Sequence, residues 1–220
     1  MTLCNISAKR RFAVAAALLF AALLSSCRPS GRSQDLREQN ACERIQTTLI
    51  NLKSYRCFAT VEYKANKGSN VYETMQHSRI TGEYRVEVTG PDHVSGNVTC
   101  SDGRLIYQYS TKADGRVSLL PKETQERSEI FLTTFIKNYL TSQDVSIDVA
   151  KMDGDLYTVL EAIVPGGHPY LASEKLWMDN ETLMPVKLVI YDPDGAERII
   201  VTYSGHFEYN VELDDSLFTI

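Results

Sequence analysis

The spacing of hydrophobic residues changes near position 53 from a helical repeat to the twofold alternation of β-strands. Over residues 35–52 apolar positions recur every three or four residues, which predicts a helix with one buried face. The apolar stripe consists of Cys42, Ile45, Leu49 and Leu52. From Tyr55 onward every second residue is apolar or small, so residues 55–63 are predicted to form a half-buried strand. The folded part therefore begins with a helix followed by a sheet.

Alternating runs separated by turn residues fill most of the remaining chain. Further predicted strands cover residues 71–80, 82–89, 145–150, 156–164, 170–178, 185–191 and 196–203. Asp-Gly pairs, which are strong hairpin signals, begin at Asp102, Asp114, Asp153 and Asp194. The pattern predicts an antiparallel meander of about ten strands.

A second helix is predicted to interrupt the strands over residues 124–141. Its apolar side consists of Phe131, Phe135, Ile136, Tyr139 and Leu140. Helices with one apolar side need a sheet face to cover. The prediction is therefore an α+β domain in which a strongly curved antiparallel sheet is covered by two helices. The pattern leaves open whether the helices fill the hollow or leave a cavity.

The N-terminal residues form a basic stretch, a short apolar run and a small-residue site, which is typical of a secretory signal. The tetrapeptide Leu24-Ser25-Ser26-Cys27 resembles the bacterial lipobox. The resemblance implies cleavage before Cys27 and attachment of acyl chains such as palmitate to it. Residues 1–26 would then be the lipoprotein signal peptide, residues 27–34 a lipidated tether and residues 35–220 the folded domain. The alternative is a plain signal peptide cut near Ser26, with Cys27 an ordinary thiol.

The net charge and the cysteine content limit the kinds of binding partner and the state of the thiols. The net charge is −5, and loss of Lys9, Arg10 and Arg11 with the signal leaves about −8, which argues against nucleic-acid binding. The mature domain keeps Cys42, Cys57 and Cys100. The favoured interpretation is that all three are buried as small apolar groups, and one disulfide with a free thiol is the alternative.

The sequence predicts no catalytic, cofactor-binding or metal-binding residue. Histidines stand apart, at His77, His93, His168 and His206. Carboxylate pairs fall in predicted turns or in the C-terminal tail, at Asp179 with Glu181, Asp192 with Asp194, and Asp214 with Asp215. Hydrogen bonding within turns explains the first two pairs, and solvation the third. The twelve tyrosines suit either strand packing or the lining of a cavity or contact face.

The order of segments in the last third of the chain resembles the C-terminal half of LolA-like proteins. These segments are 175–179, 183–188, the Asp-Gly hairpin at 191–195, 199–203 and 207–218. Residues 84–91 and 101–107 resemble upstream strands of that fold. The resemblance implies a half-open β-barrel closed by helices.

Within that superfamily the chain resembles the GerS-like germination lipoproteins of spore-forming bacteria. The residues that carry this resemblance are 52–57, 66–68, 135–139 and 175–218. It implies a non-catalytic lipoprotein on the outer face of the cytoplasmic or forespore membrane, acting with a cell-wall amidase in spore cortex processing. A carrier or sensor of acyl chains or lipoproteins is the alternative. The edge of an open sheet would also allow a homodimer by strand pairing.

Overall fold

The computed structural model describes residues 30–112, 117–121, 128–152, 154–166 and 169–220. The chain has two compact units, residues 1–39 and 40–220. The first contains the beginning of helix α2 (Ser30–Ile50), whose last turns belong to the second unit. The predicted helix at 35–52 is therefore confirmed, with an earlier start and an end at Ile50, so that Leu52 lies just beyond the helix. The fold described below is that of residues 40–220.

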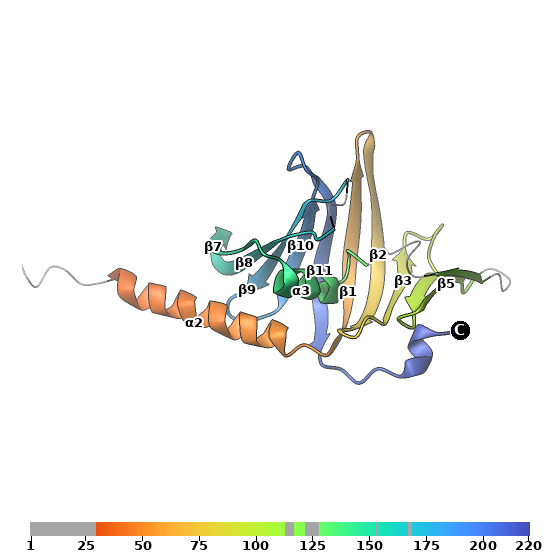
Figure 1. Cartoon of the computed structure of the whole chain (residues 1–220), viewed down its shortest axis with the longest axis horizontal. Helices are drawn as coiled ribbons and strands as arrows, with labels where there is room; N and C mark the ends of the chain where they lie inside the picture. Colours follow the sequence, from red (N-terminus) through yellow and green to blue (C-terminus); the bar gives the residue numbers. More distant parts are fainter. Residues whose placement is uncertain (1–29, 113–116, 122–127, 153, 167–168) are drawn as a thin grey trace, which may run out of the picture. The chain divides into compact units, whose positions relative to one another are not determined.

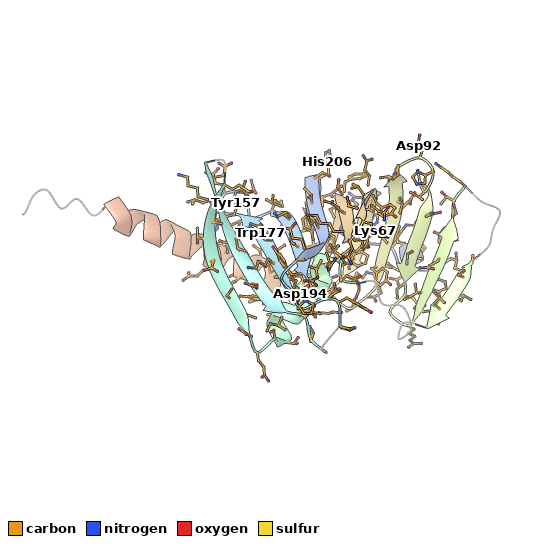
Figure 2. All side chains as sticks on the ribbon, turned by 90° about the horizontal axis from the view of Figure 1, so that it is seen from above. Lys67, Asp92, Tyr157, Trp177, Asp194 and His206 are labelled. Carbon is orange, nitrogen blue, oxygen red and sulfur yellow. The ribbon has the colours of Figure 1, made fainter. Side chains whose placement is uncertain are left out.

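Eleven strands of the described residues form one antiparallel sheet (Figure 1). The first six are β1 (Ser54–Ala65), β2 (Gly68–Arg79), β3 (Tyr84–Gly90), β4 (Asn97–Ser101), β5 (Leu105–Ser110) and β6 (Ser118–Pro121). The other five are β7 (Val145–Met152), β8 (Asp155–Ile163), β9 (Ser173–Asp179), β10 (Pro185–Tyr191) and β11 (Glu197–Tyr209). Figure 2 labels Tyr157 of β8 and Trp177 of β9 in one half of the sheet, and Lys67 and Asp92 in turns at the strand ends of the other half. The predicted α+β class with a curved antiparallel sheet is confirmed.

The sheet consists of two meanders joined by the pairing of β1 with β11. Its strand order is β6-β5-β4-β3-β2-β1-β11-β10-β9-β8-β7. A single meander, as predicted, would have no such seam. Strand β11 was predicted to end at residue 203 but runs to Tyr209. The extension follows from this seam, because residues 207–209 pair with the start of β1 and place Tyr209 opposite Tyr55. Long-range pairing of this kind leaves no local sequence signal.

The inner face of the sheet, defined here as the face packed against the helices, carries a continuous row of apolar residues across seven strands. From β7 to β2 the row runs through Ile147, Leu160, Leu176, Leu188, Val201, Val61 and Tyr72. The five central residues are at most 1% exposed. The core therefore lies along the middle of this row, and its two ends are less covered.

Helix α2 packs its predicted stripe into this core. Ile45, Leu49 and Leu52 are all less than 5% exposed, as predicted. Cys42 is only half-buried, with its Sγ 3.4 Å from Thr158 Oγ1, and Ala41 is buried beside it.

Helix α3 (Leu132–Thr141) lies over the inner face of the sheet (Figure 1), and its buried residues join those of the last turns of α2 in one core cluster. Leu132, Phe135 and Ile136 are buried, whereas Leu140 is 56% exposed. The prediction that Leu140 lies on the packed side is therefore wrong: the buried residues of α3 lie in its first turns, and Leu140 belongs to the last, exposed turn. The predicted start at 124 lies outside the described residues, and 128–131 are not helical. Two contacts anchor the helix start: Leu132 N donates to Tyr55 Oη at 3.2 Å, and the hydroxyls of Thr133 and Ser78 are 2.7 Å apart.

The C-terminal segment ends in a short 3₁₀ helix, η2 (Asp215–Phe218), packed near β3 and β4. Phe218 is 1% exposed, and the Arg79 guanidinium lies 4.7 Å from its ring centre. Asp215 pairs with Arg79 at 2.7 Å, and Asp214 Oδ1 accepts a hydrogen bond from Ser216 N. Both carboxylates are exposed to solvent, as predicted; in addition Asp214 caps η2 and Asp215 forms a surface ion pair with Arg79.

Candidate functional site

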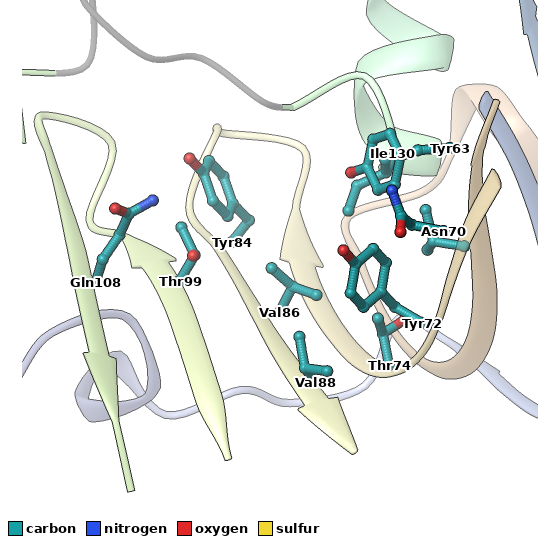
Figure 3. Close-up of a pocket in the computed structure, with 11 residues that line it drawn as sticks. Tyr63, Asn70, Tyr72, Thr74, Tyr84, Val86, Val88, Thr99, Gln108 and Ile130 are labelled. Atoms are coloured by element: carbon teal, nitrogen blue, oxygen red, sulfur yellow. The ribbon is translucent and has the colours of Figure 1, made fainter. Parts of the chain in front are cut away.

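A pocket of about 360 Å³ opens on the inner face of β1–β5 (Figure 3). It is lined by Val61, Tyr63, Asn70, Tyr72, Thr74, Tyr84, Val86, Val88, Thr99, Gln108 and Ile130. Strand alternation places these side chains together, since the predicted face of Tyr84, Val86 and Val88 forms the centre of the lining. The sequence left open whether the helices fill the hollow or leave a cavity, and the structure shows both. Core side chains of the helices pack over β8–β11, and a cavity remains over β1–β5.

Aromatic rings form much of the pocket wall. Tyr63 and Tyr72 stand edge to face with ring centres 6.0 Å apart, and Tyr84 packs 4.7 Å from Phe131. Val86 and Val88 lie between Tyr72 on one side and Thr99 on the other (Figure 3). None of the lining side chains in the described residues carries a formal charge. The pocket therefore suits an uncharged ligand.

The two edge strands of the sheet differ sharply in length. Seven of the eight residues of β7 are exposed, and within the described chain this strand pairs only with β8. On its inner face Val145, Ile147 and Val149 are 38–43% exposed. At the opposite edge, β6 has four residues and ends at Pro121, which cannot donate to another strand. A long, apolar and uncovered edge such as β7 is a template for pairing with another chain.

Glu174 is a buried carboxyl group that the sequence analysis did not single out. It lies on the inner face of β9 in line with Leu176 and Met178 and is 1% exposed. Burial, with a smaller contribution from Glu129, raises the pKa of Glu174 to about 7, although a hydrogen bond with Asn138 of α3 lowers it. The sequence contained a signal for this buried carboxyl group, because Glu174 occupies an apolar-face position of an alternating strand. Its burial beneath α3 points to an effect on stability.

Glu174 should make the protein less stable as pH rises from about 4.5 to 7. In this window the unfolded chain releases the proton while the folded chain keeps it, so the free energy of unfolding falls, by about 3 kcal/mol at most. Glu174→Gln should remove this slope, measured by urea unfolding at several pH values. The exposed Glu181→Gln is the matched control. An unchanged slope in Glu174→Gln would show that another group causes it.

The carboxylate pairs predicted to lie in turns have structural roles. Asp179 Oδ1 accepts from the Glu181 and Thr182 amides, and Asp192 binds turn amides and Arg198, which confirms the turn interpretation. Burial lowers the pKa of His77, which is 8% exposed between Arg56 and Arg85.

The cysteines of the described domain are free thiols. Cys57 and Cys100 are buried and Cys42 is half-buried, so the favoured interpretation is largely confirmed. Several predicted features lie outside the described residues: the lipid attachment expected at Cys27, the expected signal peptide and the start of the expected tether, together with His168, Asp114 and Asp153.

The described residues contain neither a cluster suited to a metal ion nor a helix suited to span a membrane. No group of three or more His, Cys, Asp or Glu side chains is placed to hold a metal ion in this part of the chain. Among the described helices, none combines the length and apolar character needed to cross a membrane.

Comparison with known proteins places these features in context. The family model described as sporulation protein YdcC-like matches residues 9–218. Comparison with curated protein sequences gave no match.

Solved structures similar to the chain include LolA-superfamily proteins, in line with the sequence resemblance. The GerS lipoprotein complexed with the CwlD amidase of Clostridioides difficile is 27% identical, with a TM-score of 0.47 over 80% of this chain and 95% of that one. A LolA superfamily protein from Nitrosomonas europaea is 16% identical, with a TM-score of 0.45 over 83% and 97%. Lipoprotein LppX of Mycobacterium tuberculosis is 13% identical, with a TM-score of 0.44 over 80% and 96%.

Proposed function

Since the chain belongs to the family of YdcC-like sporulation proteins, we propose that it is a lipid-anchored binding protein whose partner is a cell-wall amidase. In this proposal it acts in spore cortex processing and germination, and its domain performs no catalysis itself. Residues 1–26 direct export, Cys27 carries the acyl chains, and residues 27–34 tether the domain to the outer face of the cytoplasmic or forespore membrane.

The observation that carries the proposal is the open edge of β7. An eight-residue strand with one unpaired edge presents alternate N–H and C=O groups to solvent, and an extended segment of a partner can satisfy them. Ile147 and its neighbours Val145 and Val149 add apolar surface beside these groups. Soluble proteins normally protect such an edge, as Pro121 and the short β6 do at the other end of the sheet.

The amidase is the partner class to test first, because GerS is in complex with an amidase and the sequence resembles GerS-like lipoproteins. The lipid anchor supports a binding role, since tethering raises the local concentration of the domain at one membrane surface. The alternative, a carrier of acyl chains, requires a long apolar cavity. Core side chains such as Phe135 and Leu188 fill the hollow next to the pocket, which favours binding through the sheet edge.

Titration of the cell-wall amidase of the same organism against the full chain in lipid nanodiscs tests this proposal. Ile147→Lys should weaken binding at least about tenfold, because it puts a charge on the apolar edge. Leu119→Lys is the matched control, since Leu119 is 57% exposed on the opposite edge strand and should leave affinity unchanged.

Equal effects of the two substitutions, or no binding by the wild type, would contradict the proposal. The molecular mass of the protein in the absence of amidase shows whether copies of the chain associate with one another. If wild-type copies dimerise through β7, and Ile147→Lys abolishes the dimer without any amidase binding having been seen, the edge serves self-association instead.

A further inference from the structure

We propose that the inner-face pocket binds an uncharged sugar unit bearing hydroxyl and acetamido groups, as found in glycan strands of N-acetylated amino sugars. The pocket lies on β1–β5, whereas the proposed partner edge is β7 at the far end of the sheet. The two proposed sites can therefore be tested independently, and failure of one does not affect the other.

The central surface of the pocket is apolar and aromatic. Val86 and Val88 form an apolar patch on β3, and the rings of Tyr63 and Tyr72 lie beside it (Figure 3). One face of a pyranose ring exposes mainly C–H groups, which pack well against such a surface. Tyrosine suits this role because it combines a large apolar ring with a hydroxyl that can hydrogen-bond.

Polar groups border this apolar surface on two sides. Asn70 lies beside Tyr63 on one side, and Thr99 and Gln108 lie on the other, near Tyr84 (Figure 3). An amide side chain both donates and accepts hydrogen bonds, so it can pair with a sugar hydroxyl or with an acetamido group. The arrangement fits a ligand with an apolar face and a polar periphery.

Two other ligand classes fit less well. A phosphate or carboxylate would find no cationic side chain among the described lining residues to pair with it. An acyl chain would cover Asn70, Thr99 and Gln108 without offering hydrogen bonds, which leaves polar groups unsatisfied. The volume of about 360 Å³ is also at the small end of ligand pockets, as expected for a short saccharide segment.

The test is calorimetric titration of the full chain in lipid nanodiscs with N,N′-diacetylchitobiose. The wild type should bind with a Kd in the millimolar range or lower. Gln108→Met keeps the size of the side chain but removes its amide, and Tyr72→Leu removes an aromatic ring; each should weaken binding about tenfold. Tyr107→Leu is the control, because Tyr107 lies next to Gln108 in β5 and is held by Asp102 instead of lining the pocket.

A parallel titration with the fluorescent fatty acid cis-parinaric acid separates the sugar from the acyl chain. The proposal predicts that Gln108→Met does not create or strengthen saturable binding of this fatty acid. Such strengthening would overturn the proposal. So would a failure of the disaccharide to bind at about 10 mM, a concentration at which a millimolar site would be largely occupied. A Tyr107→Leu variant that weakens disaccharide binding as much as the pocket variants do would also overturn it. Circular dichroism of each variant confirms that it is folded.

Discussion

Replacing Cys27 by alanine should abolish acyl labelling and release the protein from membranes almost completely. In the proposed account the Cys27 thiol is the attachment point of the acyl chains. Two or more chains anchor a protein stably, whereas the acidic mature domain has no electrostatic attraction to anionic lipid to replace them. The measurement is fractionation of cells fed a labelled fatty acid.

Cys42→Ala is the control for this experiment, because Cys42 belongs to α2 and is half-buried beside Thr158. It should remain labelled and membrane-bound. Retention of unlabelled Cys27→Ala protein in the membrane fraction would contradict lipid anchoring. It would favour instead an uncleaved signal segment or attachment through another protein.

Leu49→Ala should lower the free energy of unfolding by about 2–5 kcal/mol, the usual cost of truncating a core leucine. Leu49 is 4% exposed and belongs to the core cluster that joins α2 to the inner face of the sheet. The adjacent Ile50 is 62% exposed, so Ile50→Ala should change stability by less than about 0.5 kcal/mol. Urea unfolding measures both. Equal, small effects would mean that α2 does not use its predicted stripe for packing.

Local periodicity was sufficient to predict most elements of this fold. The stripe of α2 and the alternation of β1 and β3 follow from side-chain burial within one element, and Pro185–Tyr191 matches its predicted strand residue for residue. The pairing of β1 with β11 could not be predicted in the same way, because it joins segments more than 130 residues apart. For the same reason the long β11 and the anchoring of Phe218 under Arg79 were missed.

The candidate sites depend on relations between elements rather than on motifs. Tyr72 and Gln108 line one pocket only because four strands bring β2 and β5 into one surface. The importance of β7 arises from its place at the end of the strand order, which its own sequence does not encode. Cys27 is the opposite case, since its role is predicted from a local motif alone.

Hydrogen–deuterium exchange of the full chain in nanodiscs, with and without the cell-wall amidase, tests the central claim most directly. If the partner adds a strand to the sheet, amides of β7 (Val145–Met152) should exchange at least about ten times more slowly in the complex, because their outward N–H groups become hydrogen-bonded. The amides of β6 (Ser118–Pro121), at the other edge, should be unaffected. Unchanged exchange in β7 at saturating amidase, or protection confined to other strands, would contradict the account.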